Sequence, residues 1–192
     1  MRKIYEYSHL GGSEILQVRY PLIYQEVNDV IRSIKCNKTK ISREKTKKGK
    51  SLVSPIDLNQ QFKTEFGQRG FVEIREKYTI AIDPNKDRTS QAYKIEVQGA
   101  FKQIDFSKER VLIEVQLGKY AFMFYDMAKF QFFFNSDRMD VGVEMVPCHR
   151  LHEEMSRRVS YGEQLVFDIE RLKRHFPSVP TAITLIGCEE VF

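Results

Sequence analysis

The chain is poor in cysteine and has no long apolar run. Its three cysteines, Cys36, Cys148 and Cys188, are scattered along 192 residues without a Cys-x-x-Cys pair, so we expect no disulfide framework and a reducing compartment. No stretch approaches the roughly 18 to 20 apolar residues of a membrane span, and the N-terminal segment lacks the apolar core of a secretory signal. These absences predict a cytoplasmic protein with no membrane partner.

Two common kinds of binding motif are also missing or incomplete. Gly11 and Gly12 are not followed by the Gly-Lys-Ser/Thr of a phosphate-binding loop, so no nucleotide cofactor is expected. Cys148, His149 and His152 have metal-binding side chains, but structural zinc needs four ligands in a more regular spacing. The sequence favours an ordinary helix start at this position over a zinc site.

The chain does have enough apolar residues for one core, and its positive charge is concentrated in one segment. A length of 192 residues with 42% hydrophobic and 30% charged residues predicts a single globular domain over 1–192. The net charge is +5, yet residues 35–50 alone hold eight basic residues and one acid, Glu44. Such a segment is either a solvated loop or an arm that neutralises phosphates, with Lys45, Lys47 and Lys48 as candidate contacts.

Hydrophobic periodicity predicts an alternation of helices and strands along the chain. Apolar residues at helical spacing follow Pro21, and Ser54-Pro55 is typical of an N-cap followed by a first-turn proline. The predicted helices are 21–34, 55–66, 120–134, 148–158 and 162–176, and the predicted strands are 72–82, 93–97, 101–106, 110–117, 141–146 and 181–186. This order indicates an α/β or α+β fold with a mixed sheet flanked by helices.

One predicted helix is unusually aromatic. Eight of the residues between Tyr120 and Phe134 are Phe or Tyr, and they fall all round the helix. We therefore expect this helix to be buried on several sides or to pack against a partner chain.

The strand "IEVQLGKY" (113–120) carries two polar side chains among apolar ones. Glu114 and Gln116 point to the same face because alternate residues of a strand share a face. Asp105 lies on the preceding strand and could converge with Glu114 to hold a hard divalent cation such as Mg²⁺ through carboxylate oxygens. A tight turn is expected to leave Asp105 nearer Val111, so this convergence requires a wide loop or a bent strand. The spacing alone is common in charged chains.

The segment "MSRRVSYGE" (155–163) lies between two predicted helices. Its polar and basic residues can read base edges or contact phosphate, although an ordinary solvated turn explains them equally well. The residues concerned are Ser156, Arg157, Arg158, Ser160 and Tyr161.

The segment "DFSKERVLIEVQLGKYAF" (105–122) resembles the active-site hairpin of the BglII/BstYI-like type II restriction endonucleases. These enzymes belong to the PD-(D/E)xK nuclease superfamily, and this group carries Glu-Val-Gln where others carry Glu-x-Lys. Further segments resemble the family in the same order: "YSHLGGSEILQV" (7–18), "SPIDLNQQFK" (54–63), "MDVGVEMVP" (139–147), "EMSRRVSY" (154–161) and "VPTAITLIG" (179–187). The resemblance therefore covers most of the chain and is more specific than three catalytic positions.

The resemblance implies roles for individual residues. Asp105 and Glu114 would bind Mg²⁺ with the Val115 carbonyl as a third ligand, and Gln116 would position the attacking water. Gln116 stands where lysine is usual, so it cannot supply a positive charge. A further acid is sought between residues 83 and 104, where Glu96 is a guess.

The resemblance also implies DNA contacts and an activity. Lys119 would lie against bases or phosphate, and Ser156, Arg157, Arg158 and Ser160 would form a second base-contacting region. Arg157 and Arg158 depart from the small residues expected there, which leaves the outer base pair open. The implied enzyme is a homodimer of a prokaryotic restriction-modification system that cuts double-stranded DNA at a palindrome with a GATC core, such as RGATCY, and leaves 5′ overhangs. The alternatives are a repair or junction nuclease of the same fold, or a non-catalytic DNA-binding protein.

Overall fold

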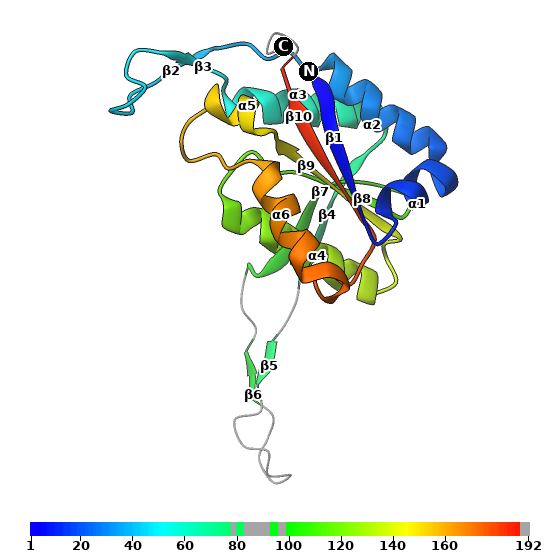
Figure 1. Ribbon diagram of the computed structural model, residues 1–192. Helices are drawn as coiled ribbons and strands as arrows, with labels where there is room; N and C mark the ends of the chain where they lie inside the picture. Colours follow the sequence, from blue (N-terminus) through cyan, green and yellow to red (C-terminus); the bar gives the residue numbers. More distant parts are fainter. Residues whose placement is uncertain (78–79, 83–92, 96–98, 189–192) are drawn as a thin grey trace.

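A mixed six-stranded sheet forms the centre of the protein in a computed structural model, which describes residues 1–77, 80–82, 93–95 and 99–188 (Figure 1). Across the sheet the strands are β1 (Arg2–His9), β10 (Thr181–Gly187), β9 (Val141–Pro147), β8 (Val111–Val115), β7 (Phe101–Lys108) and β4 (Val72–Lys77). Strand β9 runs parallel to both β8 and β10, and the other neighbours are antiparallel. The predicted mixed sheet is therefore confirmed.

Helices cover both faces of this sheet. They are α1 (Gly12–Arg19), α2 (Pro21–Ser33), α3 (Pro55–Gln68), α4 (Tyr120–Asn135), α5 (His149–Glu153) and α6 (Gly162–Leu172), which continues into the 3-10 turn η1 (Lys173–His175). On one face, α4 packs so closely on β9 that a Cβ at Gly142 would come within 2.7 Å of the Phe130 ring. On the other face, α3 stacks Phe66 against Phe106 of β7, with ring centroids 4.5 Å apart.

Two helices that the periodicity predicts have the expected starts and core faces. Pro21 is the first residue of α2, and Ser54 caps α3 by accepting a hydrogen bond from the Asp57 N–H at 3.3 Å. In α3 the residues at four-residue spacing, such as Phe62 and Phe66, are fully buried. Burial of one stripe on each helix against the sheet supplies the apolar core.

The aromatic helix α4 is buried on one side only. Phe130 and Phe133 are fully buried, whereas Phe122, Tyr125 and Phe134 are exposed by 51%, 45% and 38%. The expectation that it is buried on several sides is therefore not met within one chain, and the exposed aromatic side chains remain on the surface.

The connection between β7 and β8 is tight, and the expectation that a tight turn leaves Asp105 nearer Val111 to Leu112 is wrong. Lys108 pairs with Val111, Ser107 with Leu112 and Phe106 with Ile113, so only two residues form the turn. Glu109, the first of them, has a positive φ of 53°. In this register the next opposed pair is Asp105 and Glu114, so the tight turn itself brings the two carboxylates together.

Other expectations hold only in part. The helix predicted over 148–158 ends early, since α5 stops at Glu153 and a loop follows; α1 has no clear apolar stripe and is missed. The strand predicted over 93–97 is described as β6 (Tyr93–Ile95), which pairs with β5 (Ile80–Ile82); Val97 and Glu96 lie outside the described residues.

The expectation of no disulfide is wrong. Cys36, which follows α2, and Cys188, which follows β10, form a disulfide, with their Cα atoms 5.8 Å apart. The two residues are 152 positions apart in the sequence, so their spacing gives no indication of the pairing, and only the fold brings them together. Cys148 is a free, buried thiol. Within the described ranges, no helix has the length and apolar character needed to cross a membrane.

Candidate active site

Three carboxylates occupy neighbouring positions on three adjacent strands. Asp105 on β7 is the next position opposite Glu114 on β8, and Glu114 pairs directly with Glu144 on β9. Opposed residues on adjacent strands project to the same face, so the three side chains form a row across the sheet. Glu114 and Glu144 are almost completely buried, at 3% and 0% exposure.

Asp105 is held at the open end of this row. Its Oδ2 accepts a hydrogen bond from the Val115 N–H at 3.3 Å, which fixes the carboxylate against the end of β8. Asp105 and Val115 also line a cavity of about 310 Å³ bounded by residues of α3, β4 and β7, including Lys63 and Gln103. The row of carboxylates is therefore reached from the surface at Asp105.

Helix α4 adds two charged residues above the row. Lys129 lies with its Nζ 2.5 Å from Glu114 Oε1 and 2.7 Å from Asp126 Oδ1. Asp126 is fully buried, and its Oδ2 accepts a hydrogen bond from Gln116 Nε2 at 2.8 Å. We call Asp105, Glu114, Asp126 and Glu144 the acidic cluster; Lys129 is its cation.

Gln116 links β8 to this cluster through its side chain and to β9 through its backbone. Its N–H donates to the Met145 carbonyl at 2.9 Å, so the main chain continues alongside β9 beyond the end of β8. Its amide nitrogen is used by Asp126, and among the described residues nothing donates to its Oε1. The side-chain oxygen instead lies over Gly118, where a Cβ would come within 2.6 Å of it.

The cluster contains more negative charge than the protein neutralises. Burial raises the pKa of Glu114 well above its ordinary value, the carboxylates of Asp105 and Asp126 raise it further, and Lys129 opposes the rise. Burial likewise raises the pKa values of Asp126 and Glu144. No hydrogen bond from the described residues reaches either carboxylate oxygen of Glu144. Such an environment favours either proton uptake or the binding of an added cation.

Known proteins share both the sequence pattern and the fold of this chain. A sequence model of the family "Restriction endonuclease BglII/BglIII" matches residues 4–187. The chain belongs to the BglII/BglIII restriction endonuclease family. As a member of that family it is a type II site-specific deoxyribonuclease, an enzyme that hydrolyses phosphodiester bonds in DNA.

Solved structures of BglII have the same fold. The crystal structure of restriction endonuclease BglII complexed with a DNA 16-mer superposes with a TM-score of 0.71 at 22% sequence identity, covering 97% of this chain and 77% of that one. The crystal structure of free BglII gives a TM-score of 0.65 at 18% identity and covers 97% and 80% of the two chains. A search of curated protein sequences found no significant match.

In this member of the BglII family, the two basic loops predicted to contact DNA touch each other. One is the segment 35–50, which includes β2 (Lys40–Ile41) and leads into its partner β3 (Ser51–Leu52). The other is the segment 155–163, of which residues 155–161 form the loop before α6. Glu44, the lone acid of the first loop, accepts hydrogen bonds from the Ser156 hydroxyl at 2.6 Å and from the Arg157 N–H at 3.2 Å. We call these loops together the two-loop surface.

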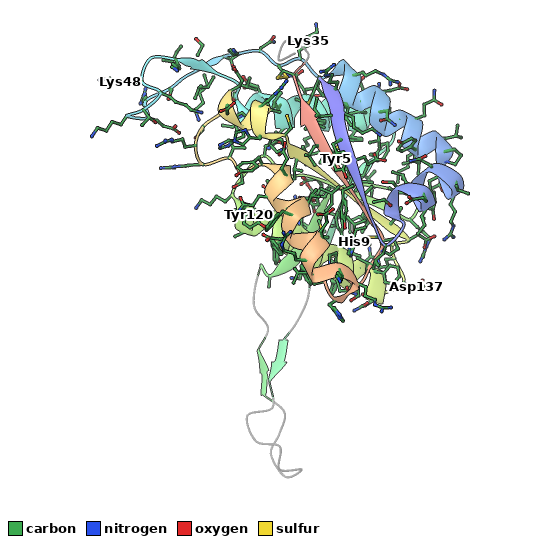
Figure 2. The ribbon with its side chains drawn as sticks, viewed as in Figure 1. Tyr5, His9, Lys35, Lys48, Tyr120 and Asp137 are labelled. Carbon is green, nitrogen blue, oxygen red and sulfur yellow. A yellow bond between two sulfur atoms is a disulfide. The ribbon has the colours of Figure 1, made fainter. Side chains whose placement is uncertain are left out.

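The lysines of the first loop are not equivalent. Lys47 donates to the main-chain carbonyls of Glu153 and Met155 at 2.7 and 2.8 Å, so its ammonium holds the two loops together. Lys45 and Lys48 are exposed, and Lys48 lies at the outer end of the arm, far from the sheet (Figure 2). Arg158 is also exposed and lines a hollow of about 490 Å³ between the loops, together with Lys40 and Arg43.

The second loop is tied to the chain that leaves β8. The Ser160 N–H donates to the Gly118 carbonyl at 2.8 Å, next to Lys119, which is exposed at the start of α4. Lys119 and the 156–160 loop are therefore neighbours, whereas Lys45 and Lys48 belong to the far side of the two-loop surface.

Sequence reasoning missed Asp126, Lys129 and Glu144. Asp126 and Lys129 are three residues apart in a helix that is otherwise mostly aromatic, and this spacing places them on one side of it. Glu144 is the single charge in the apolar strand 141–147. These isolated polar residues in apolar elements were the available signal. The group Cys148, His149 and His152 forms no metal site in the described part of the chain, and His152 Nδ1 instead lies 2.7 Å from the Val159 carbonyl.

Proposed function

We propose that this restriction endonuclease depends on Mg²⁺ and cuts both strands of a palindrome with a GATC core, RGATCY, leaving 5′ overhangs. The single observation that carries the proposal is the register of β7 and β8, which sets Asp105 beside Glu114 with the Val115 N–H on the Asp105 carboxylate. The resemblance of the hairpin to the BglII/BstYI-like enzymes supports the cleavage site. In a prokaryotic cytoplasm such an enzyme would belong to a restriction-modification system.

The residues at the open end of the acidic cluster suit Mg²⁺. Within the described ranges, no three His, Cys, Asp or Glu side chains are arranged to hold an ion by themselves. Mg²⁺ is commonly bound by one or two carboxylates together with water and substrate phosphate. Asp105 and Glu114, with the Val115 carbonyl, are oxygen donors of that kind. Burial raises the pKa of Glu114, and the carboxylates of Asp105 and Asp126 raise it further; a cation would oppose both effects.

Each residue then has a role that its contacts support. Asp105 is oriented by the Val115 N–H, and Glu114 contacts Lys129 while no ion is bound. Because Gln116 donates its amide N–H to Asp126, its Oε1 is left to accept a hydrogen bond from the attacking water. The chemistry that bound Mg²⁺ supplies is polarisation of the scissile phosphate and a lower pKa for that water.

We assign DNA recognition to the exposed cations and to the loop beside the active-site strand. Lys119 and the loop residues Arg157, Arg158 and Ser160 would face the bases, and Lys45 and Lys48 would contact phosphates. Ser156 is buried and bonded to Glu44, so its contribution is to shape the loop. Lys47, whose ammonium is bonded to two carbonyls, likewise positions its neighbours.

A homodimer follows from the need to cut two strands with one site per chain. A palindrome presents the same sequence on both strands, so a two-fold pair of chains would place one site at each strand. The exposed Phe122 and Tyr125 on α4 are the aromatic residues that such an interface would use. In such a dimer the exposed aromatic side of α4 would pack against the second chain.

Plasmid DNA of known sequence, incubated with Mg²⁺, tests the proposal. We expect discrete linear fragments that end at RGATCY with 5′ overhangs, mapped by sequencing the ends. A homodimer should convert supercoiled plasmid to linear product without accumulating nicked circles. Glu114→Ala should abolish cutting while leaving a gel shift intact, whereas Glu109→Ala, the same change on the exposed turn, should cut normally.

Other results would point to the other functions. Smeared or structure-dependent cutting would indicate a repair or junction nuclease, and a gel shift without any cutting would indicate a binding protein. Continued cleavage by Glu114→Ala would refute the assignment of the active site.

A further inference from the structure

Lys129 occupies a position that the proposed function does not require. Its Nζ lies 2.5 Å from Glu114 Oε1 and 2.7 Å from Asp126 Oδ1, and its side chain is only 11% exposed. Among the described residues no other cation forms an ion pair with the acidic cluster. A largely enclosed ammonium therefore contacts the carboxylate that the proposed function assigns to the metal.

The charges around Glu114 make this contact a strong one. Glu114, Asp126 and Glu144 are buried together, and Asp105 closes the row at its open end. Lys129 supplies one positive charge against four carboxyl groups, and its pKa is raised because Glu114 and Asp126 outweigh the effect of its burial. In a partly buried site each such charge counts for more than it would in water.

A divalent ion and this ammonium are competitors for Glu114. Mg²⁺ binds carboxylate oxygens at about 2.0 to 2.1 Å, so an ion on Glu114 would lie within a few ångströms of Nζ. Two cations this close repel each other strongly in surroundings of low dielectric constant. Binding of the metal therefore favours departure of the ammonium.

The Lys129 ammonium has a second carboxylate partner that it can keep when it leaves Glu114. Asp126 lies three residues earlier on the same helix and already contacts Nζ, and the Tyr125 ring centroid is 5.7 Å from Nζ. A rotation of the lysine side chain can give up Glu114 and keep Asp126, with no movement of α4. Gln116, bonded to the other oxygen of Asp126, holds that carboxylate in place.

We propose that Lys129 is a built-in counter-ion of the metal-free enzyme, which holds Glu114 until a divalent cation displaces it. The proposal rests on the proposed function, because it takes Glu114 as a metal ligand. Metal binding is then an exchange of one cation for another, and Lys129 sets the ion concentration at which the site fills. Lys129 acts through Glu114 and is a positioning residue.

Mn²⁺ binding to the full chain without DNA tests this directly, with free Mn²⁺ measured by electron paramagnetic resonance. We expect Lys129→Met to bind Mn²⁺ about tenfold more tightly than the wild type, because one nearby positive charge is removed. Lys129→Arg keeps the charge and should bind Mn²⁺ with the affinity of the wild type. Lys35→Met, an equal loss of charge on the exposed segment after α2, should leave the Mn²⁺ affinity unchanged.

A second measurement needs no variant that might fail to fold. Amine acetylation, followed by mass spectrometry, should label Lys129 slowly in the metal-free wild type and several times faster in Mn²⁺, because Nζ leaves Glu114. Labelling of Lys35 should not respond to the ion.

The outcomes separate this inference from the proposed function. Unchanged or weaker Mn²⁺ affinity in Lys129→Met, or Lys129 labelling that ignores Mn²⁺, would overturn the inference while leaving the metal site intact. Equal Mn²⁺ binding by the wild type and Glu114→Ala would instead overturn the metal site itself. Binding by Lys129→Met where the wild type binds none would support the exchange.

Discussion

The acidic cluster and the two-loop surface are opposite in charge and in exposure. The first is a set of four carboxyl groups between β7, β8, β9 and α4, of which all but Asp105 are buried, whereas the second carries most of its cations in solvent. In the cluster, Lys129 is the one cation among the described residues that forms an ion pair, and it is mostly enclosed with the acids. In the two-loop surface the only acid of the first loop, Glu44, is used to join the loops.

This contrast in charge and exposure suits the two regions to different tasks, the acidic cluster to cleavage and the two-loop surface to DNA binding. Buried charges interact strongly and change their protonation or bind ions, whereas exposed charges interact weakly one by one and act through their number. We therefore expect substitutions in the acidic cluster to alter cleavage, and substitutions in the two-loop surface to alter DNA binding and its salt dependence. A cluster substitution that weakens DNA binding, or a two-loop substitution that slows cleavage at saturating DNA, would contradict this division.

The largest expected effect is from Asp105→Asn. The amide keeps the shape of the side chain but removes the negative charge that the proposed metal site needs, so cleavage should fall by more than about a hundredfold. Single-turnover cleavage of plasmid DNA measures the loss, and a gel shift in Ca²⁺ should show unchanged binding. Asp137→Asn, an exposed aspartate before β9, is the control. A comparable loss of binding would break the division between the two regions.

A smaller effect is expected from the double change Lys45→Ala and Lys48→Ala. Each lysine that contacts a phosphate contributes about −0.9 to the slope of log affinity against log salt, so the slope should become shallower by about two. Fluorescence anisotropy of labelled duplex DNA over a range of salt concentrations gives this slope. The cleavage rate at saturating DNA should not change.

The matched control for that double change is Lys173→Ala with Arg174→Ala. These two exposed cations of η1 lie outside both loops, so their removal should leave the salt slope as it is. Equal slopes for the two double variants would mean that the basic arm does not contact phosphate.

The smallest effect is expected on stability, from Glu144→Gln. A carboxyl whose folded pKa is raised above 4.5 stabilises the fold at low pH and loses that contribution as pH rises through the folded value. For the metal-free wild type we therefore expect the free energy of unfolding to fall as pH rises from 4.5 through the raised pKa of Glu144. Glu144→Gln cannot ionise and should show a flatter dependence, by up to about 1.4 kcal/mol per pH unit.

Urea denaturation at a series of pH values measures this difference. Glu109→Gln, on the exposed turn, serves as the control and should follow the wild type. Parallel profiles for the wild type and Glu144→Gln would show that the pKa of Glu144 is the same in the folded and the unfolded chain.

Periodicity predicted most of the fold because the helices and strands bury one face each. The stripe of α3 and the apolar run of β8 are direct consequences of that burial, and both were found from the sequence. Helix α5 was predicted too long because the Arg-rich segment after Glu153 has helix-forming residues, yet its backbone bonds are made to Glu44 and Gly118. Contacts with distant segments override local preference there.

Of the candidate site, the sequence pointed only to residues that follow one another along one hairpin. Asp105, Glu114 and Gln116 lie within twelve positions, so the strand period could bring them together. Lys129 and Glu144 join them through the packing of α4 and the parallel pairing of β9 with β8, which no local pattern encodes. The sequence spacing of Cys36 and Cys188 likewise gave no indication that they form a disulfide.

The disulfide between Cys36 and Cys188 has a topological consequence. It closes the main chain into a covalent ring of residues 36–188, which contains the acidic cluster and all of the two-loop surface except Lys35. A protease that cuts the exposed arm once, between Lys47 and Lys48, opens this ring but leaves its two pieces joined through sulfur. The nicked protein should migrate as one species without reductant and as two species after reduction.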